Sequence, residues 1–205
     1  MTDYFALLQE IRRPWLDTGL LKQKFLTLSA AVHPDKIQSA SDAEKQAAAG
    51  AFAALNSAHA NLAEPKTRLQ HLLELELVTK PQDIQQIPAQ LADLFAEVAN
   101  TCRQTDGFLA ERARATSPLV QVQYFARGEV WEKQLNTLRD QLSALHGQLL
   151  ERLQLLDQRW QAAAPGARPT QYPALEELFR LFSYLNRWNT QIQERLTQIA
   201  QFPLP

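Results

Sequence analysis

Four consecutive residues that could recognise a charged partner lie between two segments whose apolar spacing predicts helices: His33, Pro34, Asp35 and Lys36. Asp35 carries a carboxylate that can accept a charge-assisted hydrogen bond worth about 1.5 to 3 kcal/mol. Pro34 restricts the unbound turn, so less conformational freedom is lost when a partner docks. His33 can donate from one ring nitrogen and accept at the other. These types, in this order, predict a stiff and charged recognition turn.

A catalytic pair formed by His33 and Asp35 is the alternative chemistry. It is poorly supported, because proline separates the two side chains on a turn that faces solvent. The sequence also places no glycine-rich phosphate cradle, metal-ligand spacing or candidate nucleophile nearby. We therefore expect a binding site and no enzyme, with no metal and no cofactor.

The segment before the turn predicts an amphipathic helix. Asp17 can cap its start. Its apolar side chains recur at i, i+4, i+7 and i+11, the period of one helix face, at Leu21, Phe25, Leu28 and Val32. Pro34 has no amide hydrogen and pushes the preceding residue out of the α region, so this helix must stop at His33.

The segment after the turn predicts a second helix that pairs with the first. Ser41 and Glu44 have the spacing of a capping box. A second apolar stripe then follows, at Ala48, Phe52, Leu55 and Leu62. Two such stripes joined by a short polar turn can bury their faces only against each other. The result should be an antiparallel helical hairpin with residues 33–36 exposed at its tip.

This hairpin with its turn resembles a J domain, the module by which a co-chaperone triggers ATP hydrolysis in a chaperone of the seventy-kilodalton heat-shock family. The resemblance implies a small first helix from residues 4–8 and recognition of Asp35 by a chaperone arginine. It also implies a basic face on the helix before the turn. The last turn of that helix is uncharged, so we expect association to depend only weakly on salt. The predicted chaperone-binding residues are Lys22, Lys24, His33, Pro34, Asp35 and Lys36.

The rest of the chain is almost entirely helical in pattern. A further helix opens at Pro65, and the polar stretch 79–83 suggests a boundary, so we predict a J domain in residues 1–78 and a second domain in residues 79–205. Long amphipathic segments begin near Pro88 and Pro173. Between them, apolar residues from Trp131 to Trp160 recur at spacings of three and four. The sequence therefore predicts an all-α protein in which a three-helix bundle follows the J domain.

Composition narrows the functional class. The chain has 205 residues, 45% of them hydrophobic, and a formal net charge of -1, which argues against a nucleic-acid binder held by a basic surface. The sequence contains no run of eighteen apolar residues, so no membrane span is predicted. The N-terminus also lacks the pattern of a secretion signal. Cys102 is the single cysteine, which suits a reducing compartment. We therefore expect a cytoplasmic protein.

A J domain followed only by a helical bundle resembles the HscB family, the co-chaperones of bacterial iron-sulfur cluster assembly. Stretches of both regions carry this resemblance, at residues 3–7, 25–36, 65–75, 179–182 and 191–196. It implies that the bundle docks a cluster-assembly scaffold protein and presents it to a chaperone similar to HscA or DnaK. The cluster would belong to the scaffold, because such centres need several thiolates and this chain has only Cys102.

The resemblance places the scaffold site on the first bundle helix, with an aromatic residue from the last helix. The corresponding client-binding residues are Leu91, Asp93, Leu94, Phe95, Glu97, Phe179 and Phe182. Core packing is the alternative role for the apolar ones. The acidic run typical of the family is largely missing, and the connection 162–173 is longer than its pattern. A J-domain adaptor for another client, or self-association through the stripe from Trp131 to Trp160, therefore stays open.

Overall fold

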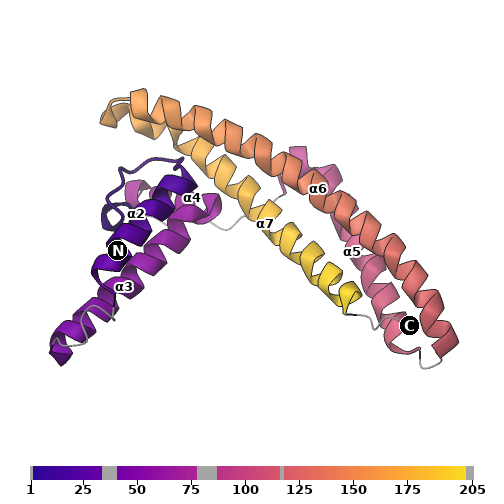
Figure 1. Ribbon diagram of the computed structural model, residues 1–205. Helices are drawn as coiled ribbons and strands as arrows, with labels where there is room; N and C mark the ends of the chain where they lie inside the picture. Colours follow the sequence, from indigo (N-terminus) through magenta and orange to yellow (C-terminus); the bar gives the residue numbers. More distant parts are fainter. Residues whose placement is uncertain (1, 34–40, 78–86, 116–117, 202–205) are drawn as a thin grey trace. The chain divides into compact units, whose positions relative to one another are not determined.

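The computed structural model describes residues 2–33, 41–77, 87–115 and 118–201 (Figure 1). Every regular element within these ranges is a helix, which confirms the predicted all-α class. Among these helices, none combines the length and the apolar character that crossing a bilayer requires.

The chain forms two compact units. The first comprises Met1–Gln82 and Glu151–Phe179, and the second comprises Asp83–Leu150 and Arg180–Pro205. Two long helices, α6 (Pro118–Ala162) and α7 (Tyr172–Ala200), contribute residues to both units. The division into domains at residues 1–78 and 79–205 stays a prediction about which parts fold independently.

The first unit contains the predicted hairpin and its flanking helices. Its N-terminal part is built from α1 (Tyr4–Leu7), α2 (Thr18–Ala31), α3 (Asp42–Ala63) and α4 (Pro65–Leu77). As predicted, α4 begins at its proline, where the missing amide hydrogen costs nothing. Buried apolar side chains from all four helices and the α1–α2 loop form one core, including Phe5, Leu8, Leu16, Leu21, Leu55, Leu62, Leu69, Leu72 and Leu73.

A buried arginine ties α4 to the loop between α1 and α2. The Arg68 side chain is 1% exposed, and its Nε donates to the Pro14 carbonyl oxygen at 2.8 Å. One terminal nitrogen of the same group donates to the Leu62 carbonyl oxygen at 2.6 Å. Burial lowers the pKa of Arg68 to about 10, so the group stays charged at neutral pH. These hydrogen bonds fix the base of the hairpin.

The ends of α6 and α7 in the first unit are joined by a 3-10 helix, η3 (Pro165–Gln171), which occupies most of the longer connection 162–173. Arg152 of α6 and Glu177 of α7 form an ion pair at 3.3 Å. The guanidinium of Arg168 lies over the indole of Trp160, 5.0 Å from the ring centroid. This end of the helical pair is thus ordered by its own side chains.

In the second unit, three helices pack together as predicted. A short 3-10 helix, η2 (Ala89–Leu91), leads into α5 (Ala92–Ala113), which packs with the parts of α6 and α7 that belong to this unit. Ring contacts join every pair of helices: Phe108 with Trp131, Phe95 with Trp188, and His146 with Phe182. The helix α6 runs without a break through Gly128.

Candidate functional site

Side-chain caps set the ends of the hairpin arms where the sequence predicts them. Asp17 accepts a hydrogen bond from the Leu20 amide at 2.9 Å, so α2 begins at Thr18. Ser41 and Glu44 form a full capping box, in which the Ser41 amide donates to Glu44 Oε2 at 2.9 Å. The hydrogen bonds with Ser41 lower the pKa of Glu44 below its usual value. Both caps are local and independent of the rest of the fold.

The predicted recognition turn lies largely outside the described residues. Pro34, Asp35 and Lys36 fall there, and His33 is the last residue described before them. His33 is half-buried and lies two residues after Ala31, the last residue of α2. Its imidazole ring meets the phenyl ring of Phe52 on α3 edge to face, with ring centroids 5.6 Å apart. His33 is therefore placed at the mouth of the connection between the two arms.

Burial along the hairpin changes with distance from the turn. Leu21 and Leu62, far from the turn, are fully buried. Phe25 is half-buried and stacks on His59, with centroids 4.5 Å apart, and Phe52 near the turn is also half-buried. These apolar side chains are thus buried most completely at the end of the hairpin far from the turn.

The two basic residues predicted on α2 differ in their surroundings. Lys22 is exposed, and no ion pair is found for it within the described ranges. Lys24 is bound instead to the loop after α1: its Nζ lies 2.6 Å from Glu10 Oε1 and donates to the Gln9 carbonyl oxygen at 3.1 Å. Gln9 has a φ of 54°, a left-handed conformation that is energetically unfavourable for residues other than glycine. Lys24 therefore already has a structural role, whereas Lys22 is available to a partner.

A buried carboxylate binds the loop before α2 to the distal end of α6. Asp157 is 2% exposed and forms an ion pair with Arg13 through two hydrogen bonds. It also accepts from the Trp15 amide at 3.3 Å and from Gln161 Nε2 at 2.7 Å. Close by, Trp160 Nε1 donates to the Arg12 carbonyl oxygen at 3.0 Å. Trp160 ends the apolar stripe of α6 and is fully buried, and the stripe alone does not predict its partner in the loop before α2.

The client-binding residues predicted on α5 and η2 are exposed to different degrees. Leu91 is 2% exposed, so core packing describes it in this structure. Leu94 is half-buried, while Asp93 and Glu97 are exposed. Phe95 is 39% exposed, the aromatic side chain on this helix that a partner could reach most easily. Client binding by these residues stays a prediction.

The two aromatic residues predicted on the last helix are both buried. Phe179 is 5% exposed and belongs to the first unit. Phe182 is fully buried in the second unit, where its ring lies edge-on to His146 with centroids 5.3 Å apart. Trp188 is an aromatic side chain of α7 that faces Phe95, with ring centroids 6.2 Å apart.

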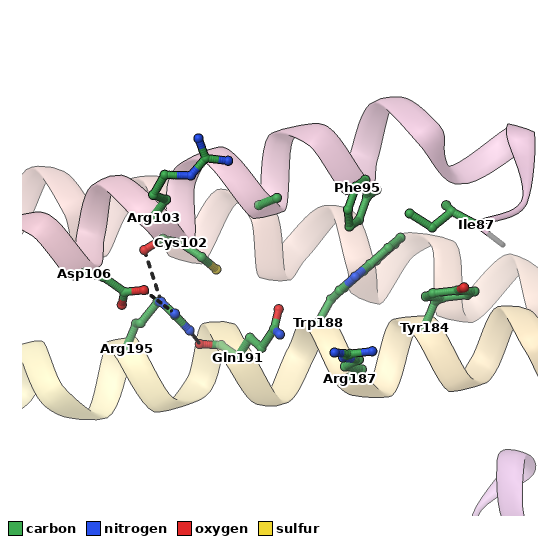
Figure 2. A pocket seen from close by; sticks show the side chains of 11 residues that line it. Ile87, Phe95, Cys102, Arg103, Asp106, Tyr184, Arg187, Trp188, Gln191 and Arg195 are labelled. Carbon is green, nitrogen blue, oxygen red and sulfur yellow. Dashed lines mark hydrogen bonds and ion pairs between the residues drawn. The ribbon is translucent and has the colours of Figure 1, made fainter. Parts of the chain in front are cut away.

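Phe95 and Trp188 line a pocket of about 610 Å³ between α5 and α7 (Figure 2). Tyr184 extends the aromatic wall, with its ring centroid 5.6 Å from that of Trp188. The full lining is Ile87, Phe95, Ala99, Cys102, Arg103, Asp106, Tyr184, Arg187, Trp188, Gln191 and Arg195. Trp188 follows Leu185 by three residues and precedes Ile192 by four. Its position therefore fits the apolar period of the last helix, and this signal could have identified it.

An arginine held by three hydrogen bonds lies at one end of this pocket. Arg195 donates to Asp106 Oδ2 at 2.6 Å and to the carbonyl oxygens of Cys102 at 3.3 Å and Gln191 at 2.8 Å (Figure 2). Burial disfavours its charge, yet the hydrogen bond with Asp106 leaves the pKa of Arg195 raised. Burial also raises the pKa of the Cys102 thiol, which disfavours its thiolate form.

No protein-family model matches the chain. Two solved structures of similar fold cover nearly all of it. The chaperone HscB from Vibrio cholerae aligns with a TM-score of 0.61 and 18% identity, over 97% of this chain and 99% of its own. The human co-chaperone protein HscB aligns with a TM-score of 0.62 and 19% identity, over 100% of this chain and 84% of its own. The predicted resemblance to HscB is thus confirmed for the fold along the whole chain.

Proposed function

We propose that this protein is a J-domain co-chaperone that stimulates ATP hydrolysis by a seventy-kilodalton heat-shock chaperone similar to HscA or DnaK. One observation carries the proposal. The arms α2 and α3 form the hairpin that the sequence predicts, and His33 lies at the mouth of their connection, against Phe52. The next residues in the chain are Pro34 and Asp35, which can offer a carboxylate on a stiff turn. The HscB-like fold of the whole chain supports the same function.

We further propose that the second unit delivers a client, the scaffold protein of iron-sulfur cluster assembly. Fold similarity to HscB extends over the bundle as well as the hairpin, which supports a client-binding role for it. Phe95 is 39% exposed and offers the client an aromatic side chain to contact. The chain would regulate an ATPase and present a client rather than carry out catalysis itself.

Self-association through α6 is less well supported. Most of the stripe from Trp131 to Trp160 is already buried within one copy of the chain, and only Trp131 and Leu145 are half-buried. The members that are 3% exposed or less are Leu135, Leu138, Leu142, Leu149, Leu153 and Trp160. A second copy could use these side chains only if the helices separated. That would expose apolar surface at a cost of about 25 cal/mol per Å².

The chaperone function is tested by two substitutions in the predicted turn. In the full-length protein, His33→Gln and Asp35→Asn should leave the helical content unchanged and remove stimulation of the chaperone's ATPase. Losing one partner of a docked charge pair costs about 2 to 5 kcal/mol, enough to abolish the effect at ordinary concentrations. Asp42→Asn, the same chemical change at an exposed position in the first turn of α3, should preserve stimulation. Undiminished stimulation by either turn variant would refute the proposal.

The client function is tested with two substitutions, one of an exposed residue of α5 and one of a buried residue of η2. Phe95→Ala should weaken capture of a purified iron-sulfur scaffold protein and leave ATPase stimulation unchanged, at a smaller loss of stability than the truncation of a fully buried residue. Leu91→Ala should instead lower stability by about 2 to 5 kcal/mol, because Leu91 is buried. If the unmodified protein captures no scaffold while still stimulating the chaperone, the adaptor for another client becomes the better description.

A further inference from the structure

The pocket between α5 and α7 carries an excess of positive charge. Arg103, Arg187 and Arg195 line it, and Asp106 is the only carboxylate among its described lining residues. Asp106 is bound to Arg195, so these two largely cancel. Arg103 and Arg187 are both exposed, and the described part of the chain supplies neither with an ion pair. Two guanidinium groups are thus available to an anionic partner.

This local charge differs from the average of the molecule. The whole chain has a formal net charge of -1, so a general attraction to anions is not expected. Asp93 and Glu97 lie on α5 as well, but neither lines the pocket. The lining of the pocket is therefore more positive than the chain as a whole.

The other half of the pocket wall is aromatic. Phe95, Tyr184 and Trp188 face one another between the two helices, and Ile87 lies beside them (Figure 2). Phe95 retains 39% exposure because nothing in the described chain covers its outer face. The pocket volume of about 610 Å³ falls in the range that accommodates a ligand or a few anchoring side chains. Aromatic residues combined with arginine are also the types most enriched at protein interaction sites.

We propose that this pocket binds an acidic segment of the client protein, with an apolar side chain of that segment held by Phe95 and Trp188. Its carboxylates pair with Arg103 and Arg187, whose planar guanidinium groups match a carboxylate in two-point geometry. Two arginines beside a closed aromatic wall are too few for a nucleic acid, which needs a longer basic track. The inference rests on the proposed client-binding function only for the identity of the occupant.

The sign of the charge would give the site its selectivity. Oppositely charged segments are attracted, and a basic segment meets like charge at the same positions. The family resemblance implied an acidic client site on the first bundle helix. The arginines here favour the opposite sign, so this chain would take an acidic segment of its client.

The test uses the full-length protein and a displayed library of random short peptides. Peptides selected by the unmodified chain should be rich in Asp and Glu and contain an aromatic or aliphatic residue. Their affinity should fall at least about tenfold in the double variant Arg103→Glu with Arg187→Glu. The matched control is Lys133→Glu with Arg139→Glu, the same charge change at exposed positions of α6. It should lower affinity by less than about twofold.

The possible outcomes distinguish a failure of the pocket proposal from a failure of the proposed chaperone function. Selection of neutral or basic peptides, failure to select any, or equal losses in the two double variants would overturn the inference. A concentration-dependent increase in mass that Arg103→Glu with Arg187→Glu abolishes would assign the pocket to a second copy instead. ATPase stimulation is measured on the same proteins. A chain that never stimulates the chaperone but selects acidic peptides through these arginines would refute the proposed function and support the pocket.

Discussion

The imidazole ring of His33 stands edge-on to the phenyl ring of Phe52, with the ring planes at 89° and the centroids 5.6 Å apart. His33 follows α2 and Phe52 belongs to α3, so this contact joins the two arms at the entrance to residues 34–36. Edge-to-face pairs of this kind contribute about 0.5 to 1.5 kcal/mol. A residue outside the predicted recognition turn thus helps to orient the first residue of that turn.

Replacing this ring should weaken the chaperone function without unfolding the hairpin. Phe52→Leu keeps an apolar side chain and removes the ring contact, so stimulation of the chaperone's ATPase at low co-chaperone concentration should fall by a few-fold to about tenfold. Phe25→Leu is the matched control, because Phe25 forms a comparable ring pair with His59 further from the turn. It should lose similar stability and keep full stimulation. Equal losses of stimulation would show that Phe52 acts only through stability.

The two lysines of α2 should respond differently to removal. Lys22→Ala should weaken stimulation at low ionic strength and have little effect at high ionic strength, because an exposed charge acts through a screened interaction. Lys24→Ala should lower the free energy of unfolding by about 0.5 to 1 kcal/mol, since it loses Glu10 and the Gln9 carbonyl. Urea denaturation and the ATPase assay, applied to both variants, separate these effects. Identical profiles would contradict the distinction.

The hairpin could be predicted from sequence because its determinants are local. Asp17 caps α2, and Ser41 with Glu44 caps α3, each acting within three residues. Apolar periodicity then predicted which faces pack together, and Pro34 predicted where the first arm ends. Such signals need no knowledge of the rest of the chain.

Contacts between distant segments could not be predicted in this way. Arg13 and Asp157 are 144 residues apart, and no periodic pattern links a loop arginine to one acidic residue on a long helix. Similarly, periodicity predicted that Phe182 lies on the apolar face of the last helix, and the position of Trp188 fits the same period, but periodicity does not say which helix each residue contacts. The prediction of Phe182 as an accessible client residue followed a family pattern, while Trp188, inside the same stripe, is the residue beside Phe95.

A double-mutant cycle tests the buried ion pair. Asp157→Ala should destabilise the protein by about 3 kcal/mol, because it leaves the Arg13 guanidinium and the Trp15 amide without their acceptor. A guanidinium keeps its proton at neutral pH whatever its neighbours, so Arg13 cannot relieve this loss by deprotonating. Arg13→Met combined with Asp157→Ala should lose less stability than the two single variants added together, because the first change removes the guanidinium that the second leaves unpaired. Additive losses in urea denaturation would show that the two residues act independently.

A buried histidine at the base of the hairpin acts as a hydrogen-bond acceptor. His71 is 5% exposed, and its Nε2 accepts a hydrogen bond from the Tyr4 amide at 3.0 Å. Its ring also stacks on that of Phe5, with centroids 5.8 Å apart. Only the neutral imidazole has a lone pair at this nitrogen, so protonation would remove the acceptor that holds the start of α1.

Stability should therefore depend on pH through His71. Burial lowers its pKa in the folded protein below the usual 6.5, although Asp3 and Glu74 act in the opposite direction. Below about pH 6.5 the unfolded chain binds a proton that the folded chain does not, so the stabilisation is complete above that value and is lost as pH falls toward the folded pKa. His71→Gln keeps an acceptor that does not titrate, and should remove this part of the slope while His33, His59 and His146 remain. Urea unfolding followed by circular dichroism between about pH 7.5 and about pH 5.5 measures it. Parallel slopes for the two proteins would mean that His71 titrates alike in both states.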